Sequence, residues 1–248
     1  MNNCYLSLIV PAYNEEKRIL PSLKRIYEYL SSQEYSYEII VVDDGSTDST
    51  VDVVKNFITH DMPIVILTNG TNKGKGYTVR HGMLSAKGKY IFFTDADLST
   101  PIEELTKALP YLCDDFDVVI GSRSLPKSDI LVHQPWYREK MGKIFNFFVK
   151  IILIPGIVDT QCGFKGFKRE VIEPICDKCK IDGFSFDVEI LYLAQKYNFK
   201  INEIPIQWEN STLSKVSPIK HSIQMFIDLI GIKIKDLSKE EIQYSKIS

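Results

Sequence analysis

The stretch FFTDADLSTP at residues 92–101 places two aspartates, Asp95 and Asp97, directly after the apolar run YIFF of residues 90–93. A short apolar run bounded by polar residues predicts a strand buried on both faces of a sheet. The two carboxylates that follow must repel each other unless a cation lies near them. In isolation the stretch fits either a polar strand end or a cation site, and the surrounding sequence has to distinguish the two.

The first half of the chain alternates apolar runs of this kind with segments of helical periodicity. After each run, apolar residues recur at the three- and four-residue spacing of one helix face. Strands that alternate with helices predict an α/β fold with a mostly parallel sheet, covered by helices on both faces. The runs occupy residues 5–10, 37–42, 63–68, 89–94 and 117–121.

The second half is less regular, and it contains no linker that would divide two independent domains. We expect one domain over residues 1–212. A C-terminal amphipathic helix and tail over residues 213–248 would pack on that domain or on a membrane surface. The predicted elements are helices at about 136–153, 186–197 and 218–237, a glycine-containing strand or turn at 162–167, and a strand at 200–208.

Composition excludes several classes of protein. The 248 residues are 44% hydrophobic and 25% charged, which is usual for a globular protein. The formal net charge of −2 provides no overall positive field, so we expect no nucleic-acid partner. No stretch reaches the roughly 18 apolar residues of a membrane-spanning helix. The sequence leaves a homo-oligomer open.

The five cysteines form an odd, irregularly spaced set, unlike a disulfide framework. Together with an N-terminus that lacks a signal peptide, they indicate a reducing, cytoplasmic environment. Cys176 and Cys179 form a lone CxxC pair, which is a weak signal for zinc or redox chemistry. We expect these two cysteines to be structural.

Polar and charged residues gather where the five predicted strands end. In parallel α/β sheets, ligands bind beyond the carboxyl ends of the strands. Each segment alone would be a turn or a helix cap, but independent turns need not all carry charge at one edge. We therefore predict a single ligand crevice. Its segments are PAYNEE at 11–16, DDGS at 43–46, NKGKG at 72–76, DAD at 95–97 and GSR at 121–123.

At this point the ordered set PAYNEE, DDGSTDST, NKGKG, DADLS, GSR and TQCGF resembles glycosyltransferase family 2, over about residues 5–235. The later segments GFSFDVEILYLAQ and EIPIQWENSTLSKVSP resemble the branch that charges dolichyl or undecaprenyl phosphate with glucose. The resemblance implies a GT-A fold, which is Rossmann-like, and a D-x-D metal motif. It also implies inverting transfer of a hexose, expected to be glucose from UDP-glucose, to a polyprenyl phosphate.

The same resemblance assigns the donor site. It implies that Asp97 ligates a divalent cation, Mn²⁺ or Mg²⁺, while Asp95 is shared between the metal and the ribose. Ser99 stands where relatives that make mannosyl lipids carry a glutamine ligand, and water is its alternative as third ligand. Such a cation would neutralise the diphosphate of the departing nucleotide. The nucleotide-sugar residues implied are Pro11, Ala12, Tyr13, Glu15, Asp43, Asp44, Lys75, Gly76, Asp95 and Ala96.

The acceptor side needs cations. A lipid monophosphate is mostly dianionic at pH 7, so it can attack without a strong general base. Arg123 and Arg138 are the candidates for binding that phosphate, and with Asp97 they form the expected catalytic set. Arg138 could equally be an exposed helix residue that covers apolar surface. If the acceptor were a glycan hydroxyl, Asp159 or Asp187 could act as the base.

Asp187 and Glu189 could also be structural partners of the two arginines. Two further alternatives are a nucleotidyltransferase of similar architecture and a binding module without activity.

Residues 127–150 and 211–237 combine an excess of lysine and arginine with aromatic or aliphatic residues. Such helices lie in the headgroup plane of a membrane, although packing on each other or on the core is the commoner arrangement. We expect a peripheral protein on the cytoplasmic face of the membrane.

Overall fold

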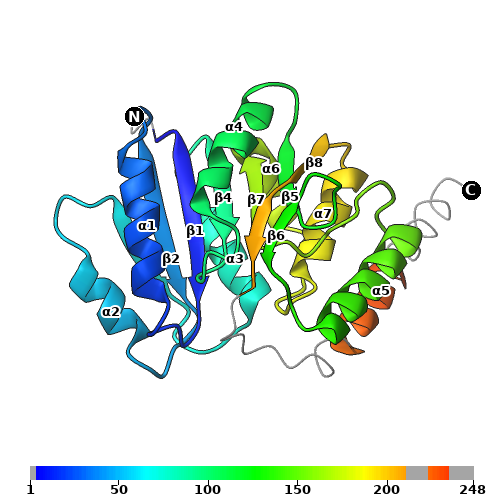
Figure 1. Ribbon diagram of the computed structural model, residues 1–248, viewed down its shortest axis with the longest axis horizontal. Helices are drawn as coiled ribbons and strands as arrows, with labels where there is room; N and C mark the ends of the chain where they lie inside the picture. Colours follow the sequence, from blue (N-terminus) through cyan, green and yellow to red (C-terminus); the bar gives the residue numbers. More distant parts are fainter. Residues whose placement is uncertain (1–3, 211–222, 235–248) are drawn as a thin grey trace, which may run out of the picture.

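A seven-stranded sheet forms the centre of the computed structural model, which describes residues 4–210 and 223–234 (Figure 1). The strand order is β3-β2-β1-β4-β7-β5-β8. Only β7 runs antiparallel to its neighbours, so the predicted mostly parallel sheet is confirmed. The strands are β1 Leu6–Ala12, β2 Tyr37–Asp43, β3 Ile64–Thr68, β4 Tyr90–Thr94, β5 Val118–Ser122, β7 Phe164–Lys168 and β8 Ile201–Pro205.

Helices cover both faces of the sheet, which is why the strands read as continuous apolar runs. In β4, Ile91 and Phe93 join the core on one face, while Tyr90 and Phe92 join the core on the other. The first face carries α3 Lys75–Ser85, α5 Trp136–Ile152, α6 Arg169–Cys176 and α7 Phe186–Lys196. The second carries α1 Ile19–Ser31, α2 Thr50–Phe57 and α4 Leu105–Cys113, with a 3₁₀ turn at Ile102–Glu104 before α4.

The predicted strand at 200–208 is two strands in the structure. β8 ends at Pro205, which has no N–H to continue the ladder. The carbonyl of Ile206 then accepts the N–H of Asp129, and the chain crosses to a small second sheet. In that sheet β9 Gln207–Glu209 pairs with β6 Asp129–Val132, a strand that the sequence analysis did not predict.

The glycine-containing segment at 162–167 becomes β7, inserted between β4 and β5. Gly166 lies opposite Phe92 on the neighbouring strand, and a Cβ there would overlap the Phe92 ring. The glycine therefore leaves room for the Phe92 ring. β7 leads directly into α6, and the loop before β7 contributes Gln161 to the site.

Residues 223–234 are helical and lie beside α5 (Figure 1). Phe226 stacks edge-on against Phe145 and Phe148, with both ring centroids 5.4 Å away. The predicted helix at 218–237 is confirmed over these residues, while its two ends and the boundary at residue 212 lie outside the described residues. The alternative that the two helices pack on each other is therefore correct for their inner faces.

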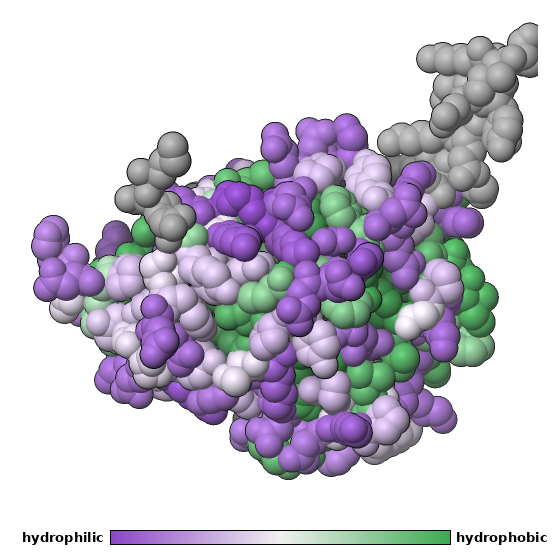
Figure 2. Space-filling model, turned by 90° about the horizontal axis from the view of Figure 1, so that it is seen from above, coloured by the Kyte–Doolittle hydropathy of each residue, from purple (hydrophilic) through white to green (hydrophobic). Residues whose placement is uncertain are grey.

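The outer faces of these two helices remain exposed. Figure 2 shows apolar surface on the side of the molecule where they lie. The exposed apolar side chains are Trp136, Tyr137, Ile144, Phe147, Phe148 and Ile151 on α5, and Ile223, Ile227, Ile230 and Ile234 on the C-terminal helix. We call this set the apolar face. Within residues 4–210 and 223–234, no helix is long and apolar enough to cross a membrane.

Candidate active site

The loops that follow β1 and β2 are joined by hydrogen bonds, which explains why PAYNEE and DDGSTDST occur together. Asn14 has a positive φ of 54°, a conformation that asparagine tolerates well. Its side-chain oxygen accepts the N–H groups of Thr47 and Asp48, and the Glu15 N–H donates to the Thr50 hydroxyl at 2.6 Å. The two loops thus form one rigid rim of the crevice.

The D-x-D segment forms a tight turn directly after β4. The Leu98 N–H donates to the Asp95 carbonyl at 3.0 Å, and Leu98 has a φ of 48°. This left-handed conformation costs a leucine about 1–2 kcal/mol, which burial of its side chain offsets. The Ser99 N–H donates to Asp97 Oδ1 at 3.1 Å. The turn therefore holds Asp95 and Asp97 toward the crevice.

Each of these two carboxylates pairs with a protein cation. Lys75 Nζ lies 2.6 Å from Asp95 Oδ1, and Arg18 Nη1 lies 3.2 Å from Asp97 Oδ2. Burial lowers the pKa of Lys75, but Asp95 and Asp187 outweigh this effect and raise it. Arg18 also binds Glu15 through two hydrogen bonds. The sequence analysis did not single out Arg18, because its contact with Asp97 spans 79 positions.

Asp44 fixes the glycine loop that lies beside the aspartates. Its two carboxylate oxygens accept the N–H groups of Lys73 and Gly74, both at 2.9 Å, and the Asn69 amide at 2.8 Å. Asp43 instead accepts the N–H groups of Gly45 and Ser46 in a local turn. The two adjacent aspartates therefore perform different structural tasks.

Most of the predicted donor residues line one pocket of about 440 Å³. Asp43, Gly76 and Ser99 do not line it: Gly76 packs beneath the backbone of residues 181–182. Roles for these three residues in nucleotide or metal binding stay predictions. The lining comprises Pro11, Ala12, Tyr13, Glu15, Arg18, Asp44, Asn72, Gly74, Lys75, Thr78, Asp95, Ala96, Asp97, Gly183 and Phe184. We call it the donor pocket.

The donor pocket offers suitable ligands for a hard divalent cation. Asp95 and Asp97 present carboxylate oxygens to the same pocket, and Mg²⁺ or Mn²⁺ prefers such ligands. Across the described part of the chain, no group of three or more His, Cys, Asp or Glu side chains could hold a metal. Two carboxylates fit a divalent cation that takes its remaining ligands from oxygens of a bound molecule and from water.

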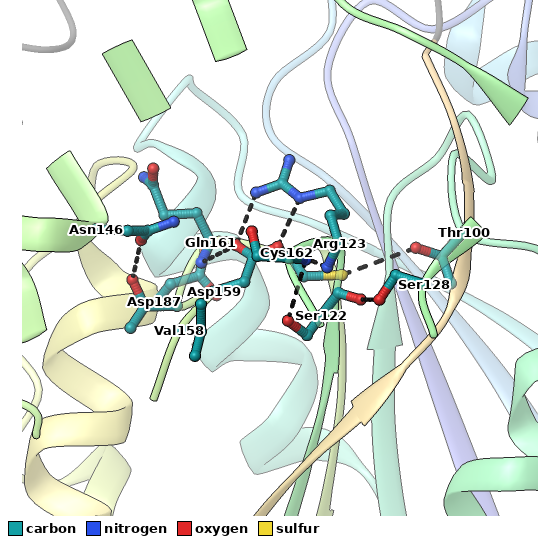
Figure 3. Close-up of polar contacts among 12 residues, drawn as sticks. Thr100, Ser122, Arg123, Ser128, Asn146, Val158, Asp159, Gln161, Cys162 and Asp187 are labelled. Carbon is teal, nitrogen blue, oxygen red and sulfur yellow. Dashed lines mark hydrogen bonds and ion pairs between the residues drawn. The ribbon is translucent and has the colours of Figure 1, made fainter. Parts of the chain in front are cut away.

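Arg123 is paired with Asp159, as Figure 3 shows. Nε and Nη2 of Arg123 donate to the two carboxylate oxygens at 2.7 and 2.8 Å, and its backbone N–H donates at 2.9 Å. Although burial alone would raise the pKa of Asp159, Arg123 lowers it from 3.8 to about 2. Asp159 is therefore an ionised partner of Arg123 and a weak base.

A second pocket of about 380 Å³ brings Arg123 and Arg138 together, although they come from different elements. Arg138 is half-buried there, and both its role in binding phosphate and the alternative that it covers apolar surface stay predictions. Trp208 also lines this pocket, with the Arg123 guanidinium 5.5 Å from its ring centre. Phe184 borders both this pocket and the donor pocket. We call the second pocket the acceptor pocket.

Asp187 and Glu189 do not pair with the arginines, so that alternative is wrong. Asp187 Oδ1 accepts a hydrogen bond from the fully buried Lys165 at 2.5 Å, and Glu189 accepts the N–H groups of Lys180 and Ile181. Burial raises the pKa of Asp187, and Lys165 and Lys75 oppose this only in part. Asp187 pairs with Lys165 instead of an arginine because β7 runs antiparallel and carries Lys165 beneath the site. No local sequence pattern indicates this contact.

Cys176 and Cys179 are free, buried thiols within the apolar core. Burial raises the pKa of Cys176 to about 12 and also raises that of Cys179. A thiol with a raised pKa is a poor nucleophile and a poor metal ligand. The structural interpretation of the CxxC pair is consistent with this packing.

Comparison with known proteins identifies the class to which this fold and site belong. Residues 7–176 match the family described as Glycosyl transferase family 2, so the chain belongs to that family. The chain is 39% identical over 249 residues to a dolichyl-phosphate beta-glucosyltransferase of Dictyostelium discoideum. That alignment covers 96% of this chain and 76% of the relative. The family predicted from the ordered motifs is confirmed.

Solved structures with the same fold are also glycosyltransferases. Mannosyl-3-phosphoglycerate synthase from Rubrobacter xylanophilus has a TM-score of 0.71 at 16% identity, over 95% of this chain and 75% of that chain. Glucosyl-3-phosphoglycerate synthase from Mycobacterium tuberculosis, in a complex with Mn²⁺, UDP and glucosyl-3-phosphoglycerate, has a TM-score of 0.65 at 18% identity. That match covers 93% of this chain and 80% of the synthase. The predicted GT-A fold is confirmed.

Proposed function

We propose that this protein transfers glucose from UDP-glucose to dolichyl phosphate, with inversion at the anomeric carbon. The observation that carries the proposal is the pair of adjoining pockets, one lined by carboxylates and the other by two arginines. The name of the Dictyostelium relative supports glucose as the sugar and dolichyl phosphate as the acceptor.

Asp95 and Asp97 would hold a divalent cation together with the donor diphosphate. The Mn²⁺ and UDP bound by the mycobacterial synthase support this assignment, and we propose Mn²⁺ or Mg²⁺ for this chain. When bound, the cation would neutralise negative charge on the departing UDP. Lys75, which pairs with Asp95, would contact the same diphosphate. Arg18 keeps Asp97 and Glu15 in place from the other side of the pocket.

In the reaction, an oxygen of the lipid phosphate forms a bond to the anomeric carbon of glucose. The bond from that carbon to the β-phosphate oxygen breaks, and its electron pair leaves with UDP. Arg123 and Arg138 would hold the attacking phosphate. No proton has to be removed from a dianionic phosphate, so this step needs no general base.

The placement of Asp159 and Asp187 supports phosphate over a hydroxyl acceptor. A hydroxyl needs a base within hydrogen-bond reach of the attacking oxygen. Neither carboxylate lines the donor or the acceptor pocket, and each is paired with a cation, Asp159 with the half-buried Arg123 and Asp187 with the buried Lys165. We infer that a long lipid acceptor would extend along α5, which both lines the acceptor pocket and carries much of the apolar face.

We infer further that the apolar face rests on the membrane that contains the acceptor. Lys140, Lys143 and Lys150 lie on the same helix as its aromatic side chains, a combination that favours the headgroup region. The cytoplasmic side of that membrane, the cytoplasmic compartment and a homo-oligomer stay predictions. Purified protein, UDP-glucose, dolichyl phosphate and Mn²⁺ test the proposal by formation of lipid-linked glucose.

A further inference from the structure

Among the described residues, Phe184 is the one residue that borders both the donor pocket and the acceptor pocket. Its neighbour Gly183 lines the donor pocket only. In the proposed reaction, the anomeric carbon exchanges a bond to the donor phosphate for a bond to the acceptor phosphate. That exchange must take place where the two pockets meet, and therefore close to Phe184.

One end of the segment that carries Phe184 is tied to the donor pocket. The Asp182 carbonyl accepts the N–H of Gly76 at 2.7 Å, and its carboxylate pairs with Arg80 at 2.6 Å. Earlier in the segment, the Glu189 carboxylate accepts the N–H of Ile181 at 2.8 Å. These contacts fix residues 181–182 against the glycine loop.

The other end is tied to the C-terminal helix. Ser185 is buried, and its hydroxyl donates a hydrogen bond of 2.7 Å to Asp228 Oδ2. The Gln224 amide donates to the other carboxylate oxygen at 2.9 Å. The same helix supplies Met225 to the acceptor pocket, where the Gln161 amide lies 3.7 Å from its sulfur. One helix therefore contributes to the apolar face, lines the acceptor pocket and holds the Phe184 segment.

We propose that Asp228 is a positioning residue that acts through Ser185 to keep Phe184 between the two pockets, where its ring excludes water from the transferred glucose. This inference rests on the proposed function. If Phe184 moves, water can replace the lipid phosphate as the nucleophile. The water oxygen then bonds to the anomeric carbon, UDP leaves with the electron pair, and the water proton passes to solvent. The products are free glucose and UDP.

The test compares free glucose with lipid-linked glucose, made from radiolabelled UDP-glucose and dolichyl phosphate in detergent micelles. Asp228→Ala and Ser185→Ala should each raise the ratio of hydrolysis to transfer about fivefold, which corresponds to one lost hydrogen bond. The double variant should resemble the single variants, because both remove the same interaction. Asp228→Asn should retain a near-normal ratio, because its amide oxygen still accepts from Ser185.

Two further variants complete the test. Phe184→Ala should raise the ratio more than the Ser185 variant does, because it removes the ring itself. Gln224→Ala removes the other bond to Asp228 and should leave the ratio unchanged. Melting temperatures identify any variant whose folding has changed. The ratio of hydrolysis to transfer is compared among variants that melt at the same temperature as the wild type.

The outcomes separate this inference from the proposed function. The inference alone is overturned if the wild-type protein makes lipid-linked glucose and the Phe184→Ala and Ser185→Ala variants keep the wild-type ratio. Equal ratios for Asp228→Ala and Asp228→Asn would also overturn it, since charge and not the hydrogen bond would then matter. Wild-type protein that makes no lipid-linked glucose overturns the proposed function and this inference with it.

Discussion

Gly163 lies directly against the carboxylate of Asp95, so closely that a Cβ at position 163 would overlap Asp95 Oδ2. The glycine belongs to the loop before β7, which approaches the D-x-D turn because β7 pairs with β4. Asp95 can therefore occupy its position only because residue 163 has no side chain. The relationship joins two motifs, DADLS and TQCGF, that lie far apart in the sequence.

Gly163→Ala should displace Asp95 and lower transfer activity at least about tenfold, since small displacements of catalytic groups carry large costs in rate. The metal concentration for half-maximal activity should rise as well. Gly231→Ala is a matched control, because a Cβ there meets no atom within 4 Å. Metal titrations of UDP release measure both effects, and an unchanged half-maximal metal concentration for Gly163→Ala would contradict this account of Asp95.

Asp97→Asn should lower transfer at least about 100-fold, because an amide binds a divalent cation more weakly than a carboxylate does. The cation is expected to stabilise the negative charge on the departing diphosphate by several kcal/mol. Chelation of the metal should do the same to the wild type. Ser99→Ala should retain activity within about threefold, since the bond from residue 99 to Asp97 comes from its backbone N–H. Loss of activity in Ser99→Ala without loss of stability would instead support Ser99 as a metal ligand.

The Arg123–Asp159 pair should make the free energy of unfolding depend on pH in the acid range. The pKa of Asp159 is lower in the folded protein than in the unfolded chain, so folding favours the ionised form. Its contribution is present above about pH 4 and is lost as the pH falls toward about 2. A shift from 3.8 to about 2 corresponds to about 2 kcal/mol.

Asp159→Asn should cost about 1–3 kcal/mol at neutral pH, because it removes the counter-charge of the half-buried Arg123 guanidinium. Denaturant unfolding at a series of pH values should show the wild-type and variant free energies of unfolding converging as the pH falls from 4 toward 2. A gap that stays constant over that range would rule out Asp159 as the titrating group.

Polar substitutions in the apolar face should weaken membrane binding without loss of fold. Ile227→Ser combined with Phe147→Ser should lower partitioning onto anionic vesicles at least about tenfold, because each change removes about 1.5 kcal/mol or more of apolar burial. Leu84→Ser, at a similarly exposed leucine on α3, is the control. Vesicle sedimentation at equal melting temperature measures the effect, and equal partitioning of all three proteins would exclude this face as the membrane contact.

The sequence predicts correctly those site residues that directly follow a strand in the chain. Asp95, Asp97 and Asp44 follow apolar runs, so the parallel sheet brings them to one pocket as predicted. It failed where partners are set by tertiary packing. Arg18 meets Asp97 only because α1 begins beside the β4 edge, and Lys165 is buried under the site by an antiparallel strand. No local pattern specifies either contact.

Phe184 illustrates the same limit in the site itself. Its segment, GFSFDVE, carries part of the family resemblance and two carboxylates, and both carboxylates have structural partners. The position of the aromatic ring between two pockets depends on the glycine loop and on the C-terminal helix at once. Such a three-way junction is visible only after the elements are packed.

Transfer of glucose from UDP-glucose to a lipid phosphate is the reaction on which the other proposals depend. The direct measurement incubates purified protein with radiolabelled UDP-glucose, Mn²⁺ and either dolichyl phosphate or dolichol, and quantifies lipid-linked glucose together with UDP. We expect one lipid-linked glucose for each UDP released with dolichyl phosphate, and none with dolichol. Transfer to dolichol, or no lipid-linked glucose with either acceptor, would contradict it.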